Sequence, residues 1–167
     1  MNAESTETVT PDTTLTVTTP SDREITLTRV FDAPRRLVFE AWTRTEHVPH
    51  WYGCASMKML VCEIDLRPGG AWRYVLSQPE GGEFGMHGVY REVAAPDRLV
   101  YTEVFEAFPD HEALVTMILE EQDGKTKMTA TSLYESVEVR DAVIASGMES
   151  GAAESLNRLA ERVETMK

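Results

Sequence analysis

Six apolar runs of strand length follow one another through the middle of the chain, with only short turn sequences between them. They cover residues 57–66, 71–77, 84–93, 99–105, 113–120 and 125–134. The connections contain Pro-Gly-Gly, Gly-Gly, Pro-Asp or Asp-Gly, which are typical turn sequences. None of these connections can hold a crossover helix, so the pattern predicts an antiparallel meander and excludes a parallel sheet.

The segments around the meander predict one more strand and several helices. Residues 23–31 alternate in polarity as a strand does. After them, Asp32-Ala33-Pro34 predicts a helix start with Asp32 as the capping side chain. The predicted helical segments are 35–43, 45–50, 137–145 and 148–167, and Gly147 separates the last two. The expected fold is α+β: a curved antiparallel sheet of about seven strands around a long C-terminal helix, with two short helices after the first strand.

The chain of 167 residues is expected to form one domain from residue 22 to residue 167. Residues 1–21 are rich in threonine and are expected to form a flexible tail. Within this tail, residues 14–19 alternate like a short strand, and we expect that part of it docks on a sheet edge.

Charge and composition narrow the classes of partner. A net charge of −12 argues against nucleic acid, which is bound by clustered lysine and arginine. No apolar run is long enough to span a bilayer, and the first residues lack the pattern of a signal peptide, so we expect no membrane insertion and a cytoplasmic location. Cys54 and Cys62 have no metal-binding spacing and are expected to be reduced.

The long C-terminal helix is expected to leave space on the sheet. One helix is only about 10 Å across, so it cannot fill a wide curved sheet by itself. Small residues interrupt its apolar stripe, among them Gly151 and Ala152, although glycine inside a helix costs about 1 kcal/mol relative to alanine. We therefore expect a cavity between the sheet and this helix.

Four stretches together resemble a known family. They are VFDAPRRLVFEAWTRTEHVPHWYG, EIDLRPGGAWRYV, HGVYREVAAPDRLVYTEVFE and SGMESGAAESLNRLAERV. The chain resembles, from about Asp22 to Lys167, the bacterial SRPBCC proteins, which are START-like helix-grip domains, in the group named after the C-terminal domain of the activator of heat-shock-protein-90 ATPase. The superfamily includes lipid carriers, polyketide cyclases and antibiotic-resistance proteins, so the resemblance implies the fold and a range of functions.

The expected ligand-binding residues are aromatic, methionine and small residues of the strands and the long helix. Trp51 belongs to Trp51-Tyr52-Gly53, where the family usually has an aromatic pair before glycine. The full set is Trp51, Trp72, Tyr74, Met86, Gly88, Tyr90, Tyr101, Phe105, Met117, Met128, Met148, Gly151, Ala152 and Leu156. The alternative is that the same side chains fill the core, with Trp51 as a plug between helices and sheet.

Candidate catalytic groups are few. Glu103 alternates with Tyr101 and Phe105 and so falls on an apolar face, where burial would raise its pKa. Tyr74 is a second weak candidate, with its hydroxyl facing the expected cavity. The alternative places the opposite face of this strand in the core and Glu103 in water. His47 and His50 have the spacing of a metal pair but lack a third ligand, so neither a metal site nor a cofactor is expected.

Three functions compete. The first is binding of a small hydrophobic or aromatic molecule in the cavity. The alternative is an enzyme of the cyclase, hydratase or hydrolase type that uses Glu103 and Tyr74 for acid–base chemistry. The third, implied by the family label, is a stress-related co-chaperone. A homodimer is compatible with each of these functions.

Overall fold

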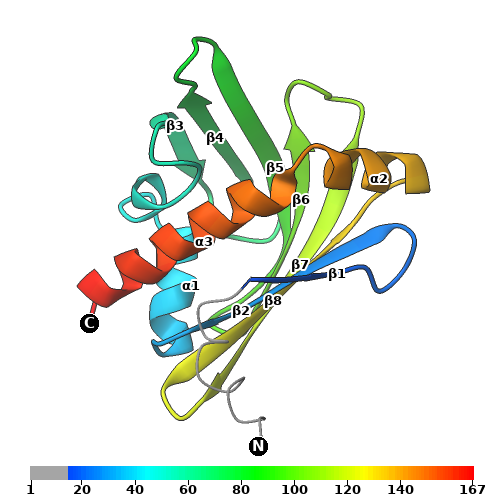
Figure 1. Cartoon of the computed structure of the whole chain (residues 1–167). Coiled ribbons are helices and arrows are strands. Elements are labelled where there is room, and N and C mark those ends of the chain that lie inside the picture. The colour runs from blue at the N-terminus through cyan, green and yellow to red at the C-terminus, as the bar shows by residue number, and fades with distance from the viewer. Residues whose placement is uncertain (1–14) are drawn as a thin grey trace, which may run out of the picture.

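The computed structural model describes residues 15–167, and these residues form one eight-stranded antiparallel sheet with helices against it (Figure 1). The strand order is β1-β2-β8-β7-β6-β5-β4-β3. The strands are β1 (Thr16–Thr18), β2 (Glu24–Phe31), β3 (Lys58–Ile64), β4 (Ala71–Ser77), β5 (Glu83–Ala94), β6 (Arg98–Phe105), β7 (Glu112–Gln122) and β8 (Lys125–Leu133). Strands β3 to β8 pair in sequence order, which confirms the predicted meander.

The eighth strand is the short β1, which lies inside the segment 14–19 that alternates in the sequence. It pairs antiparallel with β2, with Val17 opposite Leu27. Leu15, just before it, packs against the hydrophobic core. The part of the expected tail before residue 15 lies outside the described residues.

The helices are α1 (Arg35–Thr43), the 3-10 turn η3 (Val48–His50), α2 (Val137–Ala145) and α3 (Met148–Thr165). Figure 1 shows α3 crossing one face of the sheet, with α1 beside its C-terminal half. The prediction that Asp32 caps α1 is wrong. Pro34 is the N-cap residue and α1 has no side-chain cap, because extended Pro34 separates Asp32 from the first free N–H groups.

Gly147 separates α2 from α3, as the sequence predicts. Its φ of 82° lies in the left-handed region, where glycine is favoured. The two helices have different environments. In α3, Leu156, Leu159 and Val163 are buried, whereas no residue of α2 is buried.

The sheet face that α3 covers, which we call the inner face, carries the alternating set predicted from the sequence. Trp72, Tyr74, Tyr90 and Tyr101 all belong to the buried core. At Gly88, opposite Trp72, a Cβ atom would clash with the backbone oxygen of Thr102 and lie 2.7 Å from the Trp72 indole nitrogen. Glycine is therefore required at this position by a close approach of β5 and β6.

None of the helices within residues 15–167 is both long and apolar enough to cross a bilayer.

Candidate functional site

A chain of ring contacts runs along the inner face and joins helices to strands. Trp42 lies 4.8 Å from Trp51, Trp51 lies 5.7 Å from Tyr52, and Tyr52 lies 4.8 Å from Tyr74 between ring centroids. From Tyr74 the chain continues through Trp72 and Tyr101 to Tyr90. These aromatic residues provide a rigid, mostly apolar wall with hydroxyl groups on it.

Trp51 joins the short helices to this wall. Its side chain is 2% exposed, and its indole N–H donates to the backbone oxygen of Ala41 at 2.9 Å. The Trp72 indole N–H is held in the same way by the oxygen of Thr102 at 3.2 Å. Both indoles therefore have the hydrogen-bond partner that a buried tryptophan needs.

The residues expected to bind the ligand divide into two sets. The packed set is almost entirely shielded and consists of Trp51, Trp72, Tyr74, Gly88, Tyr90, Tyr101, Met117, Met128 and Leu156. The accessible set keeps exposed surface and consists of Met86, Phe105, Met148, Gly151 and Ala152. Met117 and Met128 are 0% exposed, so they fill the core as the alternative interpretation expected.

The accessible set comes from two neighbouring strands and from the start of α3. Met86 and Phe105 are register partners in β5 and β6. Met148, Gly151 and Ala152 belong to the first turns of α3, which Figure 1 shows passing in front of the sheet. A Cβ atom added at Gly151 would meet no atom within 4 Å. Glycine is therefore not required here by close packing of the backbone, and its missing side chain leaves open space.

Glu103 lies on the inner face of β6 beside Tyr101 and is partly buried. The alternative correctly placed Val100, Thr102 and Val104 in a buried face, but Glu103 is not left fully in water. The Glu103 carboxyl is half-buried, and no hydrogen bond or salt bridge within residues 15–167 includes it. Burial alone raises the pKa of Glu103 to about 7.

Three tyrosine hydroxyls lie within electrostatic reach of Glu103. Burial first, and then the Glu103 carboxylate, raise the pKa of Tyr52 and Tyr101 above their usual range and that of Tyr134 to about 12. These groups therefore remain protonated over the range in which Glu103 titrates. Tyr52 comes from the loop after η3, and Tyr134 directly follows β8, so the cluster draws on distant parts of the chain.

Tyr74, the second acid–base candidate, is less accessible. It is 6% exposed, and its ring packs against those of Tyr52 and Trp72. Burial raises the pKa of Tyr74 well above the usual value. The Tyr74 hydroxyl is thus suited to donating a hydrogen bond and unsuited to acting as a base.

The cysteines and histidines form no reactive or metal-binding group in the described part of the chain. Cys54 and Cys62 are both free thiols, and burial raises the pKa of each, that of Cys62 to about 11. No cluster of three histidine, cysteine, aspartate or glutamate side chains suited to a metal ion occurs among residues 15–167.

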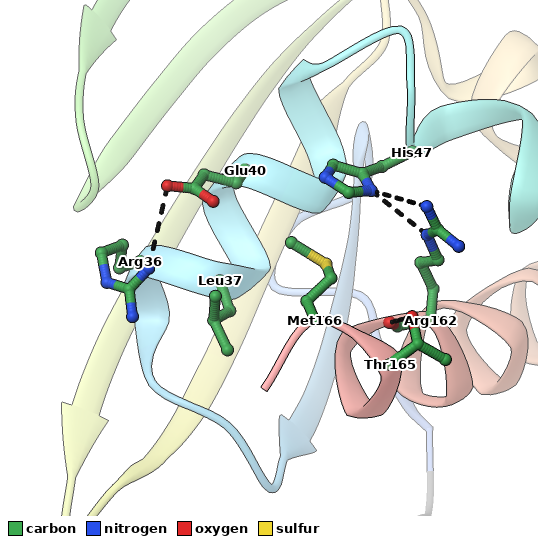
Figure 2. A pocket seen from close by; sticks show the side chains of 7 residues that line it. All are labelled: Arg36, Leu37, Glu40, His47, Arg162, Thr165 and Met166. Carbon is green, nitrogen blue, oxygen red and sulfur yellow. Dashed lines mark hydrogen bonds and ion pairs between the residues drawn. The ribbon is translucent and has the colours of Figure 1, made fainter.

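A pocket of about 430 Å³ lies elsewhere, between α1, η3 and the end of α3 (Figure 2). Its lining is Arg36, Leu37, Glu40, His47, Arg162, Thr165 and Met166. A smaller pocket of about 270 Å³ includes Arg23, Arg91 and Tyr134. Neither pocket contains a residue that the sequence predicted to bind the ligand.

The spacing of His47 and His50 suggested a metal pair, but the partner of His47 in the structure is Arg162. The Arg162 guanidinium lies 3.2 Å and 3.1 Å from Nδ1 of His47 through Nε and Nη2, and Figure 2 shows this contact across the pocket. Burial, followed by the charge of Arg162, lowers the pKa of His47. Nothing in the sequence pairs these residues, because one belongs to the loop after α1 and the other to the last turns of α3.

Comparison with known proteins finds one family model and several solved structures that match this chain. Residues 32–164 match the family model described as activator of Hsp90 ATPase homolog 1-like protein. A solved structure from Rhodobacter sphaeroides is 27% identical, with a TM-score of 0.85, and the match covers 91% of this chain and 99% of that one. No protein of curated function matches the chain.

More distant structures share the fold. A protein from Mycobacterium smegmatis is 25% identical with a TM-score of 0.79, over 89% of this chain and 96% of that one. An AHSA1-like protein from Aeromonas hydrophila is 18% identical with a TM-score of 0.66, over 84% of this chain and 93% of that one. With the helix-grip arrangement of sheet and α3 and a family match over residues 32–164, the chain belongs to the family of activator of Hsp90 ATPase homolog 1-like proteins.

Proposed function

We propose that this protein binds a small hydrophobic or aromatic molecule against the inner face of the sheet, under the first turns of α3. The observation that carries the proposal is the accessible set itself. Met86, Phe105 and Met148 are apolar side chains that keep exposed surface beside a wall of packed aromatic rings. Apolar surface left uncovered next to a core is typical of a ligand site, because burying that surface would otherwise stabilise the folded monomer.

The packed set and the accessible set have different roles in the proposed site. Packed residues such as Trp72 and Leu156 support the site from behind, and the ligand contacts the accessible set. Phe105 is 36% exposed and its ring lies 5.0 Å from Phe84 and 5.6 Å from Phe108. This short row of rings extends the apolar surface from the inner face to the β6–β7 loop.

The test is titration with a neutral apolar fluorophore, N-phenyl-1-naphthylamine, in the native protein and in Ala152→Trp. We expect saturable binding to the native protein and loss of binding in the variant, because the indole occupies the space beneath α3. Glu149→Trp is the matched control, since Glu149 is an exposed residue on the same helix. Thermal unfolding checks that each variant folds.

If Ala152→Trp fails to fold, Phe105→Ser replaces it, because Phe105 is 36% exposed and lies outside the buried core. This variant is expected to remain folded and to bind the fluorophore less tightly. Absence of saturable binding to the native protein, or equal binding by all variants, would show that the proposal is wrong.

A second candidate function rests on Glu103. A carboxyl with a pKa of about 7 can exchange protons in both directions near neutral pH, which general acid–base catalysis requires. A suitable test is exchange of the α-hydrogens of 2-tetralone for deuterium, followed by NMR. Catalysis by the native protein that Glu103→Gln abolishes would support an enzyme, and equal exchange rates would exclude this assignment.

A further inference from the structure

The unusual feature of the inner face is a carboxyl group without a partner. Some acidic side chains of this protein have charged partners: Glu106 binds Arg73 and His87, and Asp97 binds Arg35. Within residues 15–167, no lysine, arginine or histidine lies within salt-bridge distance of Glu103. A half-buried carboxyl that lacks both a cation and a hydrogen-bond donor is destabilising, so its position on this face calls for an explanation.

Within residues 15–167, the surroundings of Glu103 supply aromatic rings and no salt-bridge partner. Tyr101 and Phe105 flank Glu103 on the same face of β6. The charge of Glu103 also contributes to the raised pKa of Tyr52, Tyr101 and Tyr134. The arginine of the inner face, Arg29, instead donates to Asn157 of α3 at 2.6 Å. On α3, the stripe that faces the sheet, from Met148 through Ala152 to Leu156, has no charged residue.

Aromatic rings around a single carboxylate form the chemical environment that proteins use to hold organic cations. The negative face of each ring attracts the cation, and the carboxylate neutralises its charge. A site of this kind disfavours organic acids, whose charge Glu103 repels. Neutral molecules gain only the apolar contacts and a hydrogen bond.

We propose that Glu103 anchors the positively charged nitrogen of the ligand, so that the site takes hydrophobic amines. This inference rests on the proposed function, because the apolar part of the amine lies against Met86, Phe105 and the first turns of α3. The net charge of −12 favours the approach of a cation and disfavours that of an organic acid.

The proposal has a definite pH dependence. Glu103 binds the cation only when ionised, and its pKa of about 7 places this change near neutral pH. The tyrosines that face it stay protonated in this range, and Cys62 of β3 has a pKa of about 11. Binding of a permanent or fully protonated amine is therefore expected to strengthen as pH rises through neutrality, with Glu103 as the titrating group.

The experiment compares three ligands of matched size in displacing N-phenyl-1-naphthylamine, namely 2-phenylethylamine, 2-phenylethanol and phenylacetate. At about pH 8 the amine is expected to displace the fluorophore at a concentration at least about tenfold lower than the alcohol, and phenylacetate is expected to be weakest. At about pH 6, where Glu103 is mostly protonated, the preference for the amine shrinks.

Glu103→Gln is expected to abolish the preference for the amine while the fluorophore still binds. Glu120→Gln is the control, because it removes a charge from an exposed position on the outer face of β7. Equal displacement by amine and alcohol in the native protein would overturn the amine proposal and leave the proposed function standing. Failure of the fluorophore itself to bind would overturn the proposed function.

Discussion

Glu103 and Glu106, three residues apart at the end of β6, lie on opposite faces of the sheet and have opposite electrostatic environments. Glu106 accepts hydrogen bonds from Arg73 at 2.8 and 3.0 Å, and Nδ1 of His87 lies 2.8 Å from it. The bond to Arg73 lowers the pKa of Glu106 to about 2, whereas burial raises that of Glu103 to about 7. One face therefore holds a permanent carboxylate and the other a titrating one.

Glu103→Gln should change how stability depends on pH. The pKa of Glu103 is raised from about 4.5 to about 7 by folding, so the folded protein binds a proton more tightly than the unfolded chain between these values. Native stability therefore decreases as pH rises through this window. Relative to the native protein, the variant is expected to gain about 3 kcal/mol between pH 4 and pH 8. Urea unfolding at several pH values measures this, and a constant difference would contradict it.

Glu106→Gln should change the pH dependence of stability at lower pH, and in the opposite direction to Glu103→Gln. Folding lowers the pKa of Glu106 from about 4.5 to about 2, so its contribution to stability is complete above 4.5 and is lost as pH falls toward 2. The variant is expected to be less stable than the native protein at neutral pH and to lose less on acidification. Acid unfolding followed by circular dichroism tests this, and parallel curves for the two proteins would disprove it.

Two glycine-to-alanine variants should change the free energy of unfolding in opposite directions. Gly88→Ala places a methyl group against the oxygen of Thr102 and the Trp72 indole, so we expect a loss of about 3 kcal/mol or more. Gly151→Ala meets open space inside α3 and should stabilise by about 0.5–1 kcal/mol, the difference in helix propensity. Unfolding free energies measure both. A destabilising Gly151→Ala would mean that α3 is closely packed at this position.

His47→Asn should remove part of the sensitivity to mild acid. Folding lowers the pKa of His47 below its ordinary value of 6.5, through burial and the neighbouring Arg162, so the unfolded chain binds the proton more readily. Native stability consequently falls as pH drops below about 6.5. Asparagine keeps an acceptor for Arg162 but does not titrate. Thermal unfolding between about pH 5 and pH 7 should show a smaller decline for the variant, and an equal decline would exclude His47 as its source.

The architecture could be predicted because strand alternation and turn chemistry are local properties. Residues 71–77 and 137–145 form β4 and α2 with the predicted bounds, and the inward direction of Trp72 and Tyr74 follows from a period of two. The prediction that Asp32 caps α1 was wrong, because a local rule for the helix start cannot decide whether Asp32 or Pro34, two residues later, takes the N-cap position.

The candidate site was less predictable because exposure depends on where α3 lies along the sheet. Met86 and Met128 have the same alternation signal, yet one keeps exposed surface and the other has none. The environment of Glu103 depends on Tyr134, which β8 brings from a distant part of the sequence. The contact of His47 with Arg162 likewise needs the tertiary fold, so no spacing rule could reveal it.

The position of β2 in the sheet has a consequence for synthesis of the protein. Residues 24–31 pair with residues 126–133 of β8, and the only other neighbour of β2 among the described strands is the three-residue β1. During translation from the N-terminus, β2 therefore leaves the ribosome early and has no long strand to pair with until β8 has emerged. In the same interval, β3 to β7 can already pair as hairpins. Ile25, Leu27 and Phe31 of β2 stay uncovered during this interval, and the nascent chain is then most exposed to aggregation and most suited to chaperone binding.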